Sequence, residues 1–200
     1  MLSAAETAPV ASDTMITVLW RRIDGSGMDR CQFATTPEGK RIAGTALGLL
    51  GGRSYEIRYS VLTDPEWRTR TVGVHVQSSR DGRGLALRTD GRGTWSVSDE
   101  PVIELYGAID AALAWSPATH TLSLSRLALD VGQAAEVPVA LVTYPDRTVH
   151  RVTNSYERLG NDAYRFATPG FTSLLEVDDL AVVTAVPGLW EAVVETRDDL

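Results

Sequence analysis

Short segments rich in β-branched and aromatic residues alternate along the chain with turn-forming residues. Turn pairs such as Asp24-Gly25 and Pro145-Asp146 recur every 8 to 14 residues, and apolar segments with this spacing are typical of antiparallel sheets. The pattern predicts about a dozen strands. The clearest predicted strands cover residues 16–23, 55–62, 69–76, 85–89, 137–144, 148–156 and 182–186.

Apolar residues at helical spacing occur over residues 104–116 alone. Gly107 and Pro117 limit any helix there to one or two turns, because both residue types disfavour a helix interior. No linker divides the chain. The sequence therefore predicts a mainly all-β protein with at most short helices: a flexible segment at 1–14, a single domain at 15–195 and an acidic tail at 196–200.

The composition is that of an ordinary globular domain of 200 residues, with 44% hydrophobic and 22% charged residues. The net charge of −7 disfavours a nucleic-acid partner. No apolar run is long enough to span a membrane, and the N-terminus lacks the pattern of a secretion signal. The single cysteine, Cys31, lies in a predicted strand and cannot form an intramolecular disulfide. We therefore expect a cytoplasmic protein.

Motifs for metal binding and nucleophilic catalysis are absent from the sequence. His75, His120 and His150 lie far apart and show no metal-ligand spacing. There is no Gly-x-Ser-x-Gly sequence. The repeated Asp-Gly-Arg-Gly at 81–84 and 90–93 fits hairpin turns better than a phosphate loop, because neither copy opens a predicted helix. We assign no catalytic residue, metal ligand or cofactor.

Tryptophan and arginine occur together at two places, Trp20 with Arg22 and Trp67 with Arg68 and Arg70. Strand alternation puts each of these arginines on an otherwise apolar face. An arginine there needs a carboxylate partner or a cavity, because an unpaired buried charge costs several kcal/mol. The arginines therefore either form internal ion pairs or line a cavity for an anionic or polyhydroxylated ligand, with the Trp rings stacked on it.

Four stretches, at 19–29, 67–70, 107–127 and 155–159, resemble the putative glycolipid-binding family of bacterial proteins. Their sequences include Leu-Trp-Arg-Arg-Ile-Asp-Gly-Ser-Gly-Met-Asp, Trp-Arg-Thr-Arg and Ser-Tyr-Glu-Arg-Leu, and their order and spacing cover nearly the whole chain. The resemblance implies a spiral β-roll, in which one long, strongly curved antiparallel sheet wraps around an interior. It also implies an amphiphilic or glycolipid-like ligand.

The central motif departs from the family pattern. Asp110 and Arg126 match it, whereas Ala112 and Ser125 stand where the family has a second Asp and a first Arg. His120 stands where the family has Asn, which cannot act as a base, so His120 is unlike an inherited catalytic base.

We expect a ligand site on the concave side of the curved sheet. The predicted ligand-binding residues are Trp20, Arg22, Trp67, Arg68, Arg70, Asp110, Arg126 and Tyr156. The favoured function is non-enzymatic binding of an amphiphilic or glycolipid-like small molecule in the hollow of the sheet. One alternative is a structural or interaction protein with internally paired Arg and Trp residues. The other is an enzyme that uses Asp110 or His120 as general acid or base. The aromatic rings expected to be largely buried are those of Trp20, Tyr55, Trp67, Trp95 and Tyr156.

Overall fold

The computed structural model describes residues 14–78 and 81–199, and within them fifteen strands form one sheet. The strand order is β8-β7-β6-β5-β4-β3-β2-β1-β15-β14-β13-β12-β11-β10-β9. Neighbouring strands are antiparallel except β9 and β10, which are parallel. The predicted fold class, a mainly all-β protein built on one long curved antiparallel sheet, is confirmed.

Most strands pair with the strand that precedes or follows them in the sequence. The first eight are β1 Thr14–Arg22, β2 Gly27–Thr36, β3 Gly39–Leu50, β4 Arg53–Thr63, β5 Thr69–Ser78, β6 Asp81–Thr89, β7 Trp95–Val97 and β8 Glu100–Pro101. The remaining seven are β9 Asp110–Leu113, β10 Ala134–Val142, β11 Val149–Arg158, β12 Ala163–Thr168, β13 Phe171–Val177, β14 Val183–Val186 and β15 Trp190–Asp199.

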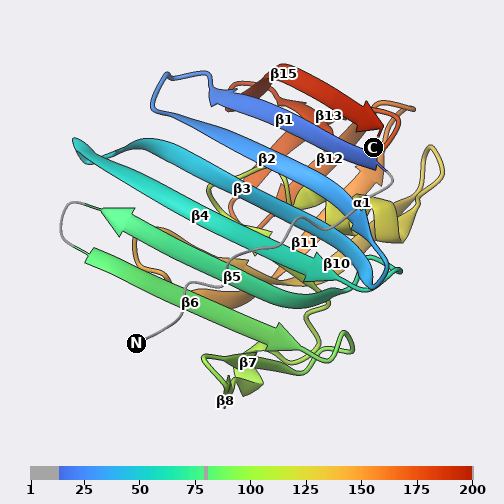
Figure 1. The fold of residues 1–200 in the computed structure, drawn as a ribbon. Helices are drawn as coiled ribbons and strands as arrows, with labels where there is room; N and C mark the ends of the chain where they lie inside the picture. The colour runs from blue at the N-terminus through green and yellow to red at the C-terminus, as the bar shows by residue number, and fades with distance from the viewer. Residues whose placement is uncertain (1–13, 79–80, 200) are drawn as a thin grey trace.

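The sheet curves until its two halves face each other. Strands β1 to β6 lie side by side in one layer, and β10 to β13 lie behind them (Figure 1). The pairing of β1 with β15 joins the halves on one side. On the other side they approach without a strand ladder: the backbone N–H of Ala111 donates to Oγ1 of Thr69 at 3.0 Å, and Nε1 of Trp95 donates to the carbonyl of Ala108 at 2.7 Å.

One hydrophobic core fills the space between the two halves. Alternate residues of each strand point inward, as the two-residue period of a strand requires. Trp20, Trp95 and Tyr156 are fully buried, as predicted. Tyr55 and Trp67 are half-buried and pack against this core.

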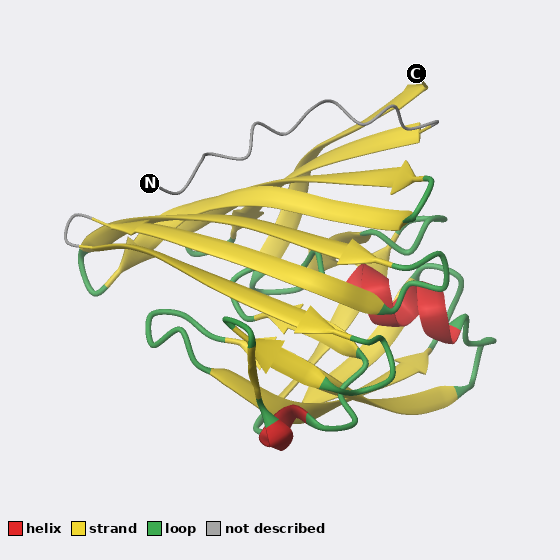
Figure 2. Ribbon diagram, turned by 60° about the horizontal axis from the view of Figure 1, so that its bottom comes forward, coloured by secondary structure: helices red, strands yellow, loops and turns green. Residues whose placement is uncertain are grey.

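The helices lie outside most of the stretch that the sequence favoured. A short 3₁₀ turn, η1 (Ile103–Leu105), overlaps the start of the predicted helical stretch 104–116, but β9 occupies residues within it. The α-helix α1 (His120–Leu127) follows instead and lies between the two layers (Figure 2). Its sequence alternates leucine with serine and threonine, which mimics a strand, and residues 121–124 are all buried. In the described part of the chain, no helix is long and apolar enough to cross a membrane.

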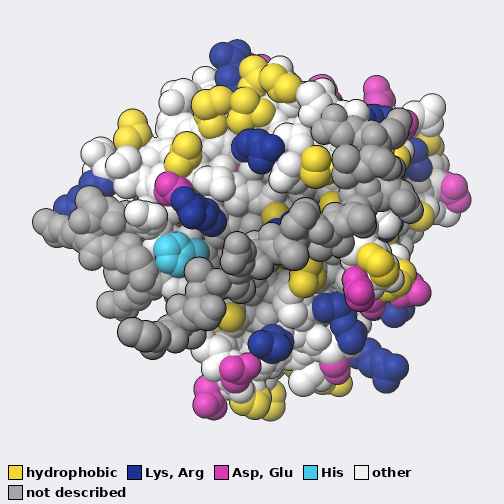
Figure 3. Space-filling view, viewed as in Figure 1, with side chains coloured by type: hydrophobic (Ala, Val, Ile, Leu, Met, Phe, Trp, Pro, Cys, Tyr) yellow, Lys and Arg dark blue, Asp and Glu magenta, His cyan; other side chains and the backbone are white. Residues whose placement is uncertain are grey.

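The C-terminal strand β15 continues through residues 196–199, which the sequence assigned to an acidic tail, and Asp199 pairs with Thr14. Arg197 forms ion pairs with Asp178 and Asp179, so acidic residues of this region have a cationic partner. Residues 1–13 of the expected flexible segment lie outside the described residues. On the face of β1 to β6, the visible acidic and basic side chains are interspersed (Figure 3). The visible, described part of that face therefore shows no broad surface of one charge.

Candidate functional site

The inner chamber is a cavity of about 240 Å³ between the C-terminal strands and the segment 112–120. Its walls are mainly apolar, and the largest apolar side chains are Leu141, Phe166, Phe171, Leu189 and Trp190. The polar side chains that reach it belong to Ser116, Thr119, His120, Asn154 and Thr168. An apolar cavity with a few polar groups is the usual form of a small-molecule site.

A second cavity of about 340 Å³, the vestibule, lies where the β1–β2 and β3–β4 turns approach the segment after β9. Three aromatic side chains line it, and the rings of Tyr55 and Tyr144 have centroids only 4.8 Å apart. Polar groups line it as well, from Arg22, Asp24 and Ser26. The vestibule is therefore aromatic and polar, in contrast to the chamber.

The two cavities adjoin. Ala114 lines both of them. The guanidinium of Arg22, in the vestibule, lies 5.2 Å from the ring centroid of Trp190, which lines the chamber. This cation–π contact keeps the arginine at the boundary between an apolar and a polar space.

Arg22 and Asp24 form a charged pair in the vestibule. Nε and Nη2 of Arg22 donate to the two carboxylate oxygens of Asp24 at 3.3 and 3.4 Å. The hydroxyl and backbone N–H of Ser26, together with Arg22, lower the pKa of Asp24 to about 2. The pair is thus ionised at neutral pH, and its long hydrogen bonds leave capacity for a polar ligand.

His120 brings an imidazole to the chamber wall from the first residue of α1. Its ring packs against Phe166 and Tyr156, with centroid distances of 4.6 and 5.9 Å. Burial lowers the pKa of His120 to about 4, so the imidazole is neutral at pH 7. Nδ1 shares a hydrogen bond with the Tyr156 hydroxyl, whereas Nε2 has no partner among the described residues.

Asp29 lies in the core behind the chamber. Its Oδ2 accepts hydrogen bonds from the hydroxyls of Tyr59, at 2.8 Å, and Ser116, and its Oδ1 has no partner among the described residues. Burial raises the pKa of this carboxyl to about 6. Ser116 thereby connects the chamber to a carboxyl group that water does not reach.

Glycines on β3 make room for the tyrosines of β4. Gly44 lies opposite Tyr59 and Gly48 opposite Tyr55 in the β3–β4 ladder. A Cβ atom at Gly44 would lie 2.4 Å from the Tyr59 hydroxyl, and one at Gly48 would lie 2.5 Å from that of Tyr55. The glycines therefore let both tyrosines lie across β3, with Tyr59 reaching Asp29 and Tyr55 lining the vestibule.

The structure does not bring the predicted arginine cluster together. Asp110 is fully buried and accepts hydrogen bonds from Ser123 and, through both oxygens, from Arg126. This closed network anchors α1 to β9. Arg22 instead contacts Asp24 and Trp190 in the vestibule, and neither Asp110 nor Arg126 lines a cavity described above.

Arg68 and Arg70 are exposed, so their expected place on the apolar face is wrong. Arg68 precedes β5, which begins at Thr69, and Arg70 lies at a β-bulge: Leu62 pairs with Thr71 and Thr63 with Thr69, so Arg70 is an additional residue on β5. A bulge shifts the alternation of side chains, which turns Arg70 outward to donate to the carbonyl of Asp90.

The other predicted residues have separate places. Trp20 is a core residue whose Nε1 donates to the carbonyl of Val183 at 2.7 Å. Tyr156 supports His120 from behind the chamber wall. Trp67 lines a different cavity, described below. The sequence prediction missed Asp29, Tyr144 and Trp190 as site residues, and the only signal for Asp29 was its place in the first family-like stretch.

Fold and cavities together define a β protein in which one curved sheet carries an apolar chamber beside an aromatic and polar cavity. The model of the family described as "Putative glycolipid-binding" matches residues 17–192, and the chain belongs to that family.

Two solved structures resemble this chain over 96% of its length. One is a DUF1089 family protein from Pseudomonas aeruginosa, with 25% identity, 98% of its own chain covered and a TM-score of 0.69. The other is a β-barrel-like protein of the domain of unknown function DUF1849 from Brucella abortus, with 10% identity, 100% coverage and a TM-score of 0.55. No curated protein matches the chain.

Proposed function

We propose that the protein binds, without catalysing a reaction, an amphiphile of the glycolipid type. The apolar part of the ligand lies in the inner chamber, and its polyhydroxylated head lies in the vestibule. The observation that supports this most directly is the direct contact of two unlike cavities at Ala114 and at the Arg22–Trp190 pair. One molecule with an apolar and a polar end matches that arrangement better than a uniformly polar or apolar one.

The head group is matched by the side chains of the vestibule. Tyr55, Trp115 and Tyr144 provide aromatic rings that can pack on the apolar side of a sugar. Arg22 supplies N–H donors and Asp24 supplies carboxylate oxygens for hydroxyl groups. The side chains of this pair carry opposite charges, so the vestibule favours a neutral polyhydroxylated group over a strongly charged one.

Catalysis is less well supported than binding. Asp110 is held by Ser123 and Arg126 and lines neither cavity, so it does not reach a ligand there. His120 does reach the chamber, but a base with a pKa of about 4 is poorly matched to neutral pH. The presence of two cavities also favours a binding protein over the other alternative, a structural or interaction protein whose Arg and Trp residues are all paired internally.

The proposed setting of this binding is the bacterial cytoplasm, without a nucleic-acid partner. Two observations support it: Cys31 is a buried free thiol, and the chain carries a net charge of −7. Fractionation of the source cells, followed by immunodetection, tests the compartment. Recovery of the protein outside the cytoplasm would contradict this part of the proposal.

The test uses n-octyl β-D-glucoside, an amphiphile with a sugar head, below its critical micelle concentration in isothermal titration calorimetry. Ala114→Trp places an indole at the junction of the two cavities, and Ala114 is exposed, so the larger side chain does not have to fit into the core. We expect saturable binding by the wild-type protein and loss of it in this variant. The matched control, Ala134→Trp, lies at an exposed position of β10 that lines neither cavity, and should bind normally. Equal binding by both variants would refute the site.

A further inference from the structure

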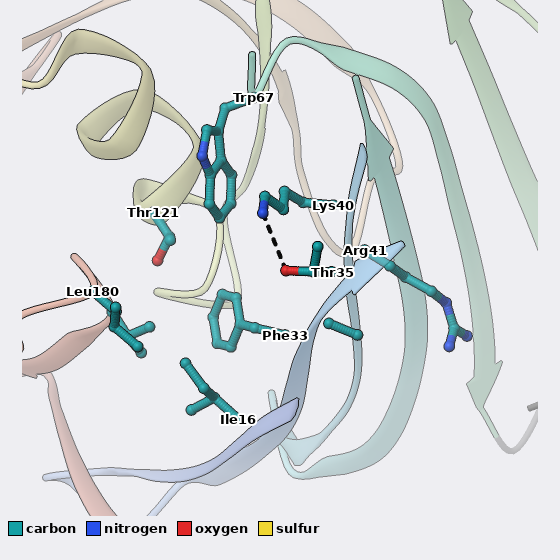
Figure 4. A pocket seen from close by; sticks show the side chains of 10 residues that line it. Ile16, Phe33, Thr35, Lys40, Arg41, Trp67, Thr121 and Leu180 are labelled. Carbon is teal, nitrogen blue, oxygen red and sulfur yellow. Dashed lines mark hydrogen bonds between the residues drawn. The ribbon is translucent and has the colours of Figure 1, made fainter. Parts of the chain in front are cut away.

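A third cavity, the end pocket, lies at the opposite end of β1, β2 and β3 from the vestibule. It has a volume of about 240 Å³. Ile16, Phe33 and Val182 form a buried apolar floor, and Leu180 and Trp67 complete the wall. The side chains that surround this space come from β1 to β3, the β4–β5 turn, α1 and the β13–β14 connection (Figure 4).

Lys40, the only lysine of the chain, supplies the positive charge of the end pocket. Its ammonium lies 5.6 Å from the ring centroid of Trp67 and donates to Oγ1 of Thr35 at 3.1 Å. No carboxylate of the described residues forms an ion pair with it. Arg41 also lines the pocket, but its guanidinium points away from the other labelled side chains (Figure 4). Lys40 is therefore the cation that faces the other labelled side chains of the pocket, and it has no carboxylate partner among the described residues.

Thr121 supplies an unused polar group on the opposite wall. Its side chain is 1% exposed, and Oγ1 has no hydrogen-bond partner among the described residues. A buried hydroxyl without a partner is costly, so such a group calls for an explanation. Thr121 lines the end pocket from the first turn of α1, where the helix dipole favours negative charge. A bound anion would satisfy this hydroxyl.

Trp67 is held over Lys40 by a strained turn. Its φ of 65° lies in the left-handed region, which is unfavourable for a bulky residue. The turn is fixed by hydrogen bonds from the N–H of Trp67 to the carbonyl of Asp64 and from the N–H of Arg68 to the carboxylate of Asp64. Strain of this kind concentrates at ligand sites.

From these observations we infer that the end pocket is a second ligand site, specific for a medium-chain organic carboxylate. Lys40 and Thr121 bind the carboxylate, and the hydrocarbon chain lies on Phe33, Ile16 and Leu180. A cavity of about 150 Å³ already holds benzene, so 240 Å³ accommodates a hydrocarbon chain of medium length but not a whole lipid. One cation with neutral donors matches a single negative charge better than a phosphate dianion. This site is distinct from the chamber and the vestibule and does not depend on the proposed function.

Because Lys40 is the sole lysine, its reaction with an amine reagent reports on the pocket directly. We would acetylate the wild-type protein with limiting acetic anhydride and follow Lys40 by peptide mass spectrometry, with the α-amino group as internal reference. Sodium octanoate should slow acetylation of Lys40 relative to that reference by about tenfold at saturation. Octanol, which has the chain without the charge, and acetate, which has the charge without the chain, should protect weakly at equal concentration.

Variants test the assigned contacts by calorimetry with octanoate. Lys40→Gln should abolish binding, and Thr121→Val should weaken it by about tenfold, the loss of one hydrogen bond to a charged group. The matched control Arg30→Gln should bind normally, because Arg30 is an exposed cation of β2 that lines none of the three cavities. Ala114→Trp should also bind octanoate normally, since it obstructs only the other two cavities.

Three results would overturn the inference: absence of protection of Lys40 by octanoate, equal protection by octanol, or loss of octanoate binding in Arg30→Gln. The labelling experiment uses the wild-type chain, so it decides the question even if Lys40→Gln fails to fold.

Discussion

Nδ1 of His120 lies 3.0 Å from the hydroxyl oxygen of Tyr156, and the two groups share a hydrogen bond behind the chamber wall. Burial keeps both side chains neutral at pH 7, because it lowers the pKa of His120 to about 4 and raises that of Tyr156. The bond fixes the imidazole ring so that its remaining nitrogen is the one available to a ligand in the chamber. Tyr156, a predicted ligand-binding residue, thus holds the ring of His120, which lines the chamber.

Tyr156→Phe tests this support. The change removes one hydroxyl and leaves Nδ1 of His120 without its partner, so we expect a loss of about 1 to 2 kcal/mol in the free energy of unfolding. Urea denaturation at pH 7 measures it. Tyr106→Phe, at an exposed tyrosine, is the matched control and should change stability little. Equal effects of the two changes would contradict the role of this hydrogen bond.

Asp29 should make the protein less stable as the pH rises. Its pKa increases from 3.8 to about 6 on folding, so between these values the native protein holds more protons than the unfolded chain. The free energy of unfolding then falls as pH rises from about 4 to about 6, by roughly 3 kcal/mol from this group, and stays low above. We expect Asp29→Asn to be more stable than wild type at pH 7 in urea denaturation.

The control for Asp29→Asn is Asp24→Asn, for which the expected change in stability at neutral pH has the opposite sign. The folded pKa of Asp24 is lowered to about 2, so its contribution to stability is present above pH 4 and is lost as pH falls toward 2. Removal of its charge should therefore weaken the fold at neutral pH.

His120 affects the pH dependence of stability in the opposite direction to Asp29. Because the pKa of His120 is lowered on folding, the free energy of unfolding decreases as pH falls from 6.5 to about 4. Asp29→Asn should expose that opposite slope, and an unchanged pH profile would count against the assignment.

The Asp110–Arg126 pair should behave as a buried ion pair. Arg126→Met leaves the buried carboxylate of Asp110 with Ser123 as its remaining side-chain partner, so we expect a loss of about 3 to 5 kcal/mol. The exposed pair of Arg165 and Glu157 is the control, and Arg165→Met should cost about 0 to 1 kcal/mol. Thermal unfolding of both variants makes the comparison, and similar losses would show that Asp110 is not isolated from water.

Gly44→Ala should disturb the tyrosine that holds Asp29. The new Cβ would lie 2.4 Å from the Tyr59 hydroxyl and 2.8 Å from the carbonyl of Arg30, so the ring or the strand must shift. We expect a loss of about 1 to 3 kcal/mol. In Gly73→Ala, the new Cβ has no neighbour within 4 Å, so this change should be neutral or slightly stabilising in the same thermal unfolding measurement. A neutral Gly44→Ala would show that Tyr59 moves freely.

The sequence by itself determined most of the strands and the family resemblance. Strand alternation is a local property of the backbone, so the inward residues of β1, such as Val18 and Trp20, could be recognised without knowledge of their partners. The four family-like stretches were equally readable, because each is contiguous in sequence. The position of α1 could not be recognised in the same way. Its leucines alternate with polar residues, as in a strand with one buried face, whereas in the structure four consecutive residues, 121–124, are all buried.

Only the tertiary structure decided which charges are paired and where the cavities lie. The bulge that turns Arg70 outward arises from its pairing with β4, and Asp29 meets Ser116, 87 residues away, only because the sheet curves back on itself. Likewise, Arg22 reaches Trp190 across the β1–β15 seam, and Thr121 faces Lys40 across the end pocket. Such contacts depend on strand pairing, on the curvature of the sheet and on residues far apart in the chain, and no local pattern encodes them.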